Sequence, residues 1–200
     1  MSVFSSKRRT LLTLPLAAAL AVSIAACGKK EVAFKGSDIS GTKLGQDMAM
    51  IDGSGKLRTL ADYKGKVAVV FFGFTHCPDV CPTAMAELAQ TMEILGNDAG
   101  KVQVLMVSVD PERDTPEILS AYVKAFNPDF VGLTGTQEQL SKTAKSFKAY
   151  YAKSAGATPD QYSMDHASSF YLIDPEGESR VLISGNASAQ DIASDIRQLL

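Results

Sequence analysis

Apolar runs alternate along the chain with segments whose apolar residues recur at helical spacing. A continuous run covers residues 67–74, and a second apolar segment, which contains the polar residues Gln103 and Ser108, lies within residues 101–110. Both are rich in β-branched side chains, which is typical of strands buried on both faces of a parallel or mixed sheet. Shorter runs at residues 130–133 and 168–174 predict two more strands. These segments together predict one central sheet.

The segments between these strands predict helices. After the first run, four apolar residues share one helical face, namely Met85, Leu88, Met92 and Leu95. Pro82 suits the first turn of this helix, and Gly96 suits its end. Three more helices are predicted over residues 116–126, over residues 136–151 and from residue 186 or 188 onwards, with Thr115 and Thr136 as caps of the first two.

Turn residues divide the rest of the chain. They predict a hairpin at residues 48–60, a loop at 152–162, and a second hairpin in which 168–174 pairs with 180–184. After the N-terminal hairpin the order of elements is β-α-β-α-β-α-β-β-α. This order predicts an α/β protein with a thioredoxin-like fold, in which helices flank a central mixed sheet.

The N-terminal segment has the pattern of an export signal. Three basic residues, Lys7, Arg8 and Arg9, precede an apolar stretch at residues 11–26, which is short for a membrane span. Small residues end this stretch just before Cys27, as in a bacterial lipobox. We therefore expect residues 1–26 to be removed and Cys27 to be lipidated. An ordinary secretory signal and an uncleaved signal anchor are the alternatives.

The export signal changes how the remaining chain is interpreted. Residues 27–43 are small and polar, and they are predicted to tether the anchor to a folded domain at residues 44–200. Removal of the signal takes three basic residues and no acidic one, which leaves 17 lysine and arginine residues against 22 acidic residues. This balance suits cationic metals or basic partners and gives no indication of nucleic-acid binding.

Export also places the remaining thiols in an oxidising compartment. Cys77 and Cys81 follow the first buried strand with C-x-x-x-C spacing. We expect them at the N-terminus of the next helix, where the helix dipole lowers the pKa of a thiol. The pair could be a structural disulfide, a redox-active dithiol or two ligands of a soft metal. A Cys77–Cys81 disulfide would close a loop of a few residues and constrain the unfolded chain little, which favours a functional pair.

Two histidines could complete a metal site. His166 precedes the strand predicted at residues 168–174, and in a thioredoxin-like sheet the loop entering that strand lies beside the cysteine turn. Two thiolates and one imidazole suit Cu(I) and can also hold Cu(II), whereas zinc would need a fourth ligand. An exposed loop histidine without a ligand role is the alternative for His166. His76 is expected to turn away from the metal, and Asp79 and Asp165 are candidate orienting groups.

Three separated motifs resemble those of the Sco/SenC family. They read FGFTHCPDVCP at residues 72–82, VSVDPERDTP at 107–116, and DH followed by YLIDP at 165–175. The resemblance extends over about residues 45–200. Three motifs in this order are far more specific than C-x-x-x-C alone.

The resemblance implies a membrane-tethered copper-binding protein that assists assembly of the binuclear copper site of cytochrome c oxidase. It implies Cys77, Cys81 and His166 as ligands of copper, as Cu(I) or Cu(II). The implied partners are the copper-bearing oxidase subunit, other copper chaperones and thiol reductants. The expected location is the periplasmic side of the cell envelope, with an anchor in the inner membrane, where the client resides.

A thiol-disulfide oxidoreductase of the cell envelope is the main alternative function. Cys77 and Cys81 would then be the catalytic, redox-active pair that forms a disulfide. Redox thioredoxins, however, use C-x-x-C and place a cis-proline just before the strand predicted here at residues 168–174. Peroxiredoxins place a threonine three residues before the reactive cysteine, whereas Thr75 stands two residues before Cys77. Both departures favour copper binding over these enzymes, and a binding module without redox or copper function is the remaining alternative.

Overall fold

The computed structural model describes residues 33–156 and 162–200. Its compact unit spans Phe34–Leu200. The expected export signal at residues 1–26 and the expected lipidation at Cys27 lie outside the described residues. None of the helices in the described ranges is long and apolar enough to cross a membrane.

One mixed sheet forms the centre of this unit. Its eight strands follow the order β1-β10-β9-β4-β5-β6-β2-β3. β4 pairs in parallel with β5, and β5 with β6, while β9 runs antiparallel to β4. Every residue of β4 is buried, as the apolar run predicted. The strands are β1 (Ser37–Asp38), β2 (Met50–Asp52), β3 (Leu57–Arg58), β4 (Val67–Gly73), β5 (Val102–Ser108), β6 (Val131–Thr134), β9 (Phe170–Ile173) and β10 (Ser179–Ile183).

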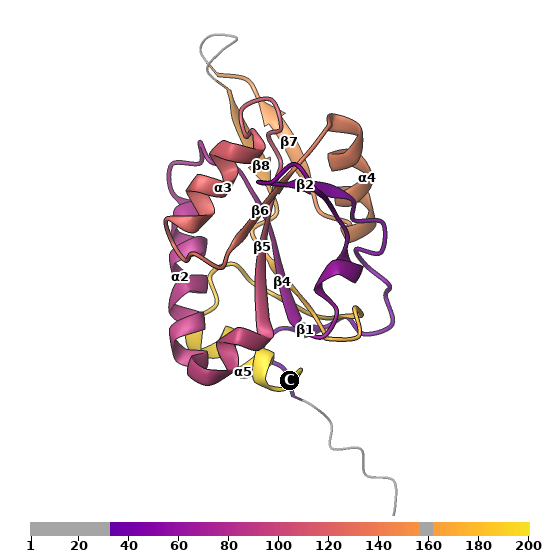
Figure 1. The fold of residues 1–200 in the computed structure, drawn as a ribbon, viewed down its shortest axis with the longest axis vertical. Coiled ribbons are helices and arrows are strands. Elements are labelled where there is room, and N and C mark those ends of the chain that lie inside the picture. Colours follow the sequence, from indigo (N-terminus) through magenta and orange to yellow (C-terminus); the bar gives the residue numbers. More distant parts are fainter. Residues whose placement is uncertain (1–32, 157–161) are drawn as a thin grey trace, which may run out of the picture. The chain divides into compact units, whose positions relative to one another are not determined.

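Helices cover both faces of the sheet. Figure 1 shows α2, α3 and α5 on one side and α4 on the other. On the side of α4, edge-to-face contacts among three rings, those of Phe72, Phe147 and Tyr171, fill the core. The α-helices are α2 (Val80–Leu95), α3 (Pro116–Lys124), α4 (Gln137–Phe147) and α5 (Ala189–Arg197), and the 3₁₀ helices are η1 (Leu60–Tyr63) and η2 (Gly96–Lys101). The predicted α/β architecture with a mixed sheet is confirmed.

Polar side chains begin three of the helices where the sequence predicted caps. Thr115, Thr136 and Ser188 each accept a hydrogen bond from the backbone N–H three residues later, at 3.1 to 3.3 Å. These bonds satisfy donors that would otherwise lack a partner in the first helical turn. Of the two predicted starts of the last helix, Ser188 is therefore the correct one.

The prediction was wrong for the segment after α4. A helix was expected through Tyr151, because Tyr151 follows Phe147 at helical spacing. The helix instead ends at Phe147, and Lys148 takes a left-handed conformation with φ of 53°. Such a residue ends a helix because it turns the chain away from the helical path.

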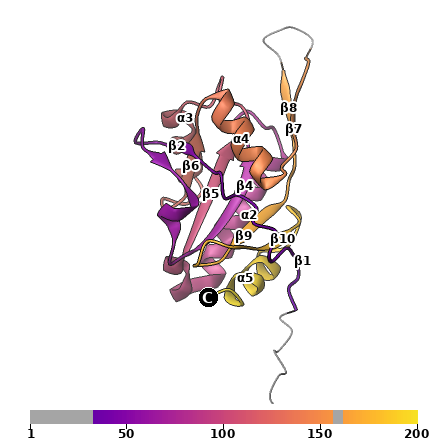
Figure 2. The ribbon, with the colours of Figure 1, turned by 90° about the vertical axis from the view of Figure 1, so that its right-hand side faces the viewer.

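A two-stranded ribbon flanks the predicted loop at residues 152–162 and takes the place of its first residues and of the predicted helix end. β7 (Tyr151–Ser154) pairs antiparallel with β8 (Ser163–His166). The ribbon shares no strand with the central sheet and projects from it, as Figure 2 shows. Pairing between residues 9 to 15 positions apart decides this structure, and local periodicity carries no record of that pairing.

The chain joins the sheet within the segment that was predicted to be a tether. β1 pairs with β10, and the buried carboxylate of Asp195 in α5 accepts hydrogen bonds from the N–H groups of Lys35 and Gly36 at 2.7 and 2.9 Å. A Cβ atom at Gly36 would lie 2.6 Å from a side-chain carbon of Val181, so this approach requires glycine. The compact unit thus begins at Phe34, ahead of the predicted boundary at residue 44.

Candidate metal centre

Three side chains from distant parts of the chain meet at the carboxyl end of β4. The Sγ atoms of Cys77 and Cys81 and a ring nitrogen of His166 all lie within 4.8 Å of one another. Within residues 33–156 and 162–200, no other group of three histidine, cysteine or acidic side chains has its ligand atoms so placed. Both cysteines are free thiols. Two sulfurs and one imidazole form a donor set that suits copper.

The start of α2 positions the two sulfurs. The backbone N–H of Cys81, in the first turn, donates to Cys77 Sγ at 3.4 Å. This bond gives a partner to one of the N–H groups that a helix start leaves free. Gly73 makes room on the other side, because a Cβ atom there would lie 3.0 Å from Cys81 Sγ. The sequence correctly predicted a cysteine pair at this strand-to-helix turn.

The expected lowering of thiol pKa is wrong for Cys81. The Cys81 side chain is fully buried, whereas Cys77 is partly exposed. Burial raises the pKa of the Cys81 thiol, and the neighbouring Cys77 raises it further, against a smaller opposing effect of a backbone hydrogen bond at Phe74. Desolvation outweighs the helix dipole here, because water cannot solvate a thiolate at this buried position.

The His166 ring is oriented for ligation. Its Nδ1 lies 3.0 Å from the carbonyl oxygen of Ala167, and its Nε2 lies 3.3 Å from Cys81 Sγ. A carbonyl can only accept, so Nδ1 carries the hydrogen and the lone pair of Nε2 faces the sulfur. Phe71 and Phe74 hold the ring edge-on, each with a centroid distance of 5.9 Å. The imidazole therefore presents its free nitrogen to the two sulfurs.

The other predicted polar candidates lie apart from this group. His76 is exposed, and its Nδ1 lies 3.1 Å from the Thr75 hydroxyl. Asp165, a candidate orienting group, accepts a hydrogen bond from the Ser154 hydroxyl on the ribbon. Asp79 is exposed and precedes α2 without a side-chain capping bond. His76 thus lies outside the ligand group, and the Ala167 carbonyl takes the orienting role proposed for the acids.

A buried acid that the sequence analysis did not single out supports the cysteine turn. Asp114, in the loop between β5 and α3, is fully buried. Its carboxylate accepts from the N–H of Thr75 at 3.1 Å, from the Thr75 hydroxyl at 2.5 Å and from the Ser108 hydroxyl at 2.6 Å. It thereby joins the end of β5 to the segment that leads into Cys77. The VSVDPERDTP motif contained this residue, but nothing in the motif showed what it contacts.

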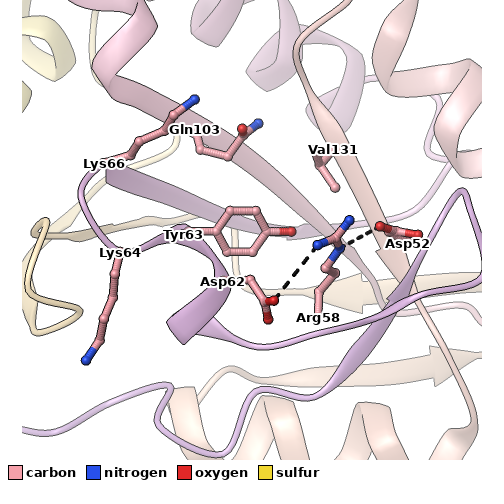
Figure 3. Close-up of a pocket in the computed structure, with 8 residues that line it drawn as sticks. All are labelled: Asp52, Arg58, Asp62, Tyr63, Lys64, Lys66, Gln103 and Val131. Carbon is pink, nitrogen blue, oxygen red and sulfur yellow. Dashed lines mark hydrogen bonds and ion pairs between the residues drawn. The ribbon is translucent and has the colours of Figure 1, made fainter.

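A surface pocket of about 280 Å³ lies away from the metal centre (Figure 3). Arg58 points into it, and its Nε donates to Asp52 at 2.6 Å while its Nη1 lies 3.9 Å from Asp62. The Tyr63 hydroxyl has no hydrogen-bond partner there, and burial raises the pKa of Tyr63 to about 12. The residues that line the pocket include no cysteine or histidine. The pocket is therefore separate from the group formed by Cys77, Cys81 and His166.

Comparison with known proteins shows which family has this site and fold. The family model described as SCO1/SenC matches residues 37–200. The chain belongs to the SCO1/SenC family. It is 39% identical over 137 residues to a SCO2-like protein of Rickettsia felis, across 68% of this chain and 67% of the relative. It is 36% identical over 154 residues to the mitochondrial SCO2 homologue of Bos taurus, across 76% of this chain and 58% of the relative. The match thus spans little more than half of the bovine SCO protein.

Solved SCO1/SenC structures share the fold. The structure of Bradyrhizobium japonicum ScoI with copper bound has a TM-score of 0.70 at 34% identity, and covers 84% of this chain and 100% of that one. A SCO1/SenC family lipoprotein from Bacillus anthracis has a TM-score of 0.69 at 30% identity, with coverage of 84% and 99%. BsSco, a Sco-family cytochrome c oxidase assembly protein with a disulfide switch, has a TM-score of 0.63 at 28% identity, with coverage of 82% and 96%. These likenesses confirm the predicted thioredoxin-like fold.

Proposed function

We propose that this protein binds copper through Cys77, Cys81 and His166 and delivers it to the binuclear copper site of cytochrome c oxidase. The observation that carries the proposal is the convergence of two thiols and an imidazole within 4.8 Å. Cu(I) prefers soft ligands such as thiolates, and imidazole suits copper in both oxidation states. The copper-bound ScoI structure and the oxidase-assembly role of BsSco support the same assignment.

The unequal burial of the sulfurs suggests an order for copper transfer. Three protein ligands leave room for a fourth ligand on the metal. A thiolate of the copper-bearing oxidase subunit can therefore bind the copper before Cys77, Cys81 and His166 release it. Cys77 is partly exposed, and Cys81 is fully buried behind it. We infer that an incoming ligand replaces Cys77 first and that Cys81 is the last sulfur to release the metal.

We also propose that the cysteine pair is redox-active. Thiol-disulfide exchange with a partner protein would join Cys77 Sγ to Cys81 Sγ, and the two electrons and two protons lost by the thiols would convert the partner's disulfide to a dithiol. The disulfide would remove both sulfur ligands, so copper binding requires the reduced pair. Cys77 is the thiol that a partner can reach, because it is the exposed member. The partners would be the oxidase subunit, other copper chaperones and thiol reductants.

We propose, finally, that a lipid on Cys27 anchors the protein on the periplasmic side of the inner membrane. The small residues before Cys27 and the basic start of the chain support a lipoprotein signal. The related SCO1/SenC lipoprotein of Bacillus anthracis supports the same arrangement. An anchor in the inner membrane would place the copper site beside its client.

Copper titration of two histidine variants tests the assignment. The reduced protein should bind one Cu(I), and His166→Ala should weaken that binding by more than tenfold in competition with a chelator. Loss of a ligand should weaken binding more than loss of a residue that only hydrogen-bonds to a ligand, which typically costs about tenfold or more. His76→Ala is the matched control, because His76 is exposed and lies outside the ligand group. It should bind copper as the parent does.

Oxidation of the same samples tests the redox proposal. The oxidised protein should lose copper, and both thiols should resist alkylation until a reductant is added. Copper affinity that does not depend on His166, together with catalytic turnover of disulfide substrates, would replace the copper chaperone with a thiol-disulfide oxidoreductase.

A further inference from the structure

The ribbon that carries His166 has to be held against the sheet by side chains. β7 and β8 pair with each other and not with any strand of the central sheet. Strand pairing with the central sheet therefore does not fix the position of the imidazole relative to the cysteines. Met164 of β8 is buried in the core and gives one contact point. A second contact point lies at Tyr162, just before β8.

Tyr162 is clasped by residues of the loop between β5 and α3 and by the opposite strand of the ribbon. The guanidinium carbon of Arg113 lies 3.7 Å from the centroid of the Tyr162 ring, and Lys153 Nζ lies 3.8 Å from it. The Tyr162 hydroxyl donates to Asp110 Oδ1 at 2.8 Å, and the backbone carbonyl of Tyr162 accepts from Arg113 Nη1 at 3.2 Å. Lys153 is also paired with Glu112 at 2.9 Å. Two cations and a carboxylate thus hold one aromatic side chain.

Arg113 links this clasp to the metal centre. Its Nε pairs with the buried carboxylate of Asp110, which fixes the guanidinium. The same guanidinium lies 5.9 Å from the centroid of the Phe74 ring, which is itself in edge contact with His166. Arg113 therefore lies between Tyr162 of the ribbon and the aromatic residue that follows β4.

One loop supports both halves of the metal centre. At one end Asp114 binds Thr75 and so holds the segment leading to Cys77. Asp110 and Arg113 of the same loop hold Tyr162 and so hold the strand that ends in His166. No residue of this loop belongs to the ligand group. Its position relative to both segments sets the distance between imidazole and sulfur.

We propose that Tyr162 is a positioning residue for His166, held by Arg113, Lys153 and Asp110 so that the imidazole meets the two sulfurs. The inference rests on the proposed copper binding of the site. Loss of the ring would leave Met164 as the remaining contact point of the two, so the ribbon would be held less firmly and the imidazole would be less well placed against the sulfurs. The cysteines would keep their own support through Asp114.

Variants of Tyr162 test the proposal in both the parent and the His166→Ala background. Tyr162→Ala should weaken Cu(I) binding about tenfold or more, which is the effect typical of removing a residue that orients a metal ligand. Tyr162→Phe should recover much of the loss, because the ring keeps its contacts with both cations. Ser163→Ala is the control, since Ser163 is exposed on the same strand. In the His166→Ala background, Tyr162→Ala should cause no further loss, as expected of two residues that act through one interaction.

Amide hydrogen exchange of the copper-free protein gives a readout independent of the metal. Tyr162→Ala should speed exchange at residues of β7 and β8, while β4 and β5 stay as protected as in the parent. Unchanged copper affinity and unchanged exchange would overturn the proposal. An equal loss of affinity in both backgrounds would also overturn it, since Tyr162 would then act on the cysteines. If His166→Ala itself binds copper like the parent, the proposed ligand set fails instead.

Discussion

Asp114 is a fully buried carboxylate whose hydrogen-bond donors are all neutral. A buried charge is costly unless donors surround it, and here one backbone N–H and two hydroxyl groups do so. Because two of the three donors belong to Thr75, the carboxylate fixes the chain two residues before Cys77. At the scale of single residues, the metal centre thus depends on a group that binds no metal.

Replacement of Asp114 by asparagine should destabilise the protein. The amide would turn its own N–H groups toward at least one donor of Thr75 or Ser108, and a buried polar group that loses its partner costs about 1–3 kcal/mol. Chemical denaturation should show this loss in the free energy of unfolding. Asp79→Asn is the control, because Asp79 is exposed and makes no capping bond. Equal stabilities for the two variants would show that the buried network contributes little.

The hairpin of β2 and β3 shows how one side chain can organise an element. Asp52 is buried, and its carboxylate accepts from Ser54 N–H at 2.8 Å, from Lys56 N–H at 3.1 Å and from Arg58 Nε at 2.6 Å. Burial alone would raise the pKa of Asp52, but hydrogen bonds from Ser54, Arg58 and Lys56 together lower it far below the usual value of 3.8. The turn of the hairpin that the sequence predicted at residues 48–60 is therefore built around an ionised acid.

The stability of this hairpin should depend on pH. The pKa of Asp52 is lower in the folded chain than in the unfolded chain, so the unfolded chain binds more protons in acid. The stabilisation is complete above about pH 4 and is lost as the pH falls further. Asp52→Asn should be less stable at neutral pH and should lose less stability between about pH 5 and pH 2 in denaturation experiments. Asp47→Asn, at an exposed position, should follow the parent curve. If the stability of Asp52→Asn fell with pH as steeply as that of the parent, Asp52 would not be the source of the pH dependence.

At the scale of the whole molecule, the copper site and the expected anchor belong to different parts of the chain. The ligands lie in the compact unit that begins at Phe34, and the expected lipid site is Cys27. Binding chemistry should therefore survive without the anchor, while delivery to a membrane-bound oxidase should not. Stable attachment by lipid usually needs more than one acyl chain, which a bacterial lipoprotein cysteine would carry.

Loss of Cys27 should separate attachment from copper binding. Full-length Cys27→Ser should move from the membrane fraction to the soluble fraction of the cell envelope, and should still bind copper through the unchanged ligand group. Fractionation after a high-salt wash, with mass spectrometry of the purified N-terminus, measures both attachment and lipid. Full retention of Cys27→Ser in the membrane would indicate an uncleaved signal anchor.

Sequence alone determined the parts of the protein that local pattern encodes. The apolar run of β4, the helical face of α2 and the caps Thr115 and Thr136 follow from the spacing of side chains within one element, so that spacing is enough to predict them. The cysteine pair was placed for the same reason. His166 was assigned as a ligand through the resemblance of separated motifs, because a lone histidine 85 residues from Cys81 carries no local signal.

The tertiary structure decided what depends on atoms brought together from distant positions. It replaced a predicted helix end and loop with the β7–β8 ribbon, since strand pairing depends on the partner segment. It showed the thiol of Cys81 to be buried, where desolvation outweighs the helix dipole. It also showed the contacts of Asp114 with Thr75 and of Tyr162 with Arg113 and Lys153, on which the proposed support of the site rests. Burial and partner choice are properties of the folded chain, and periodicity along the sequence does not record them.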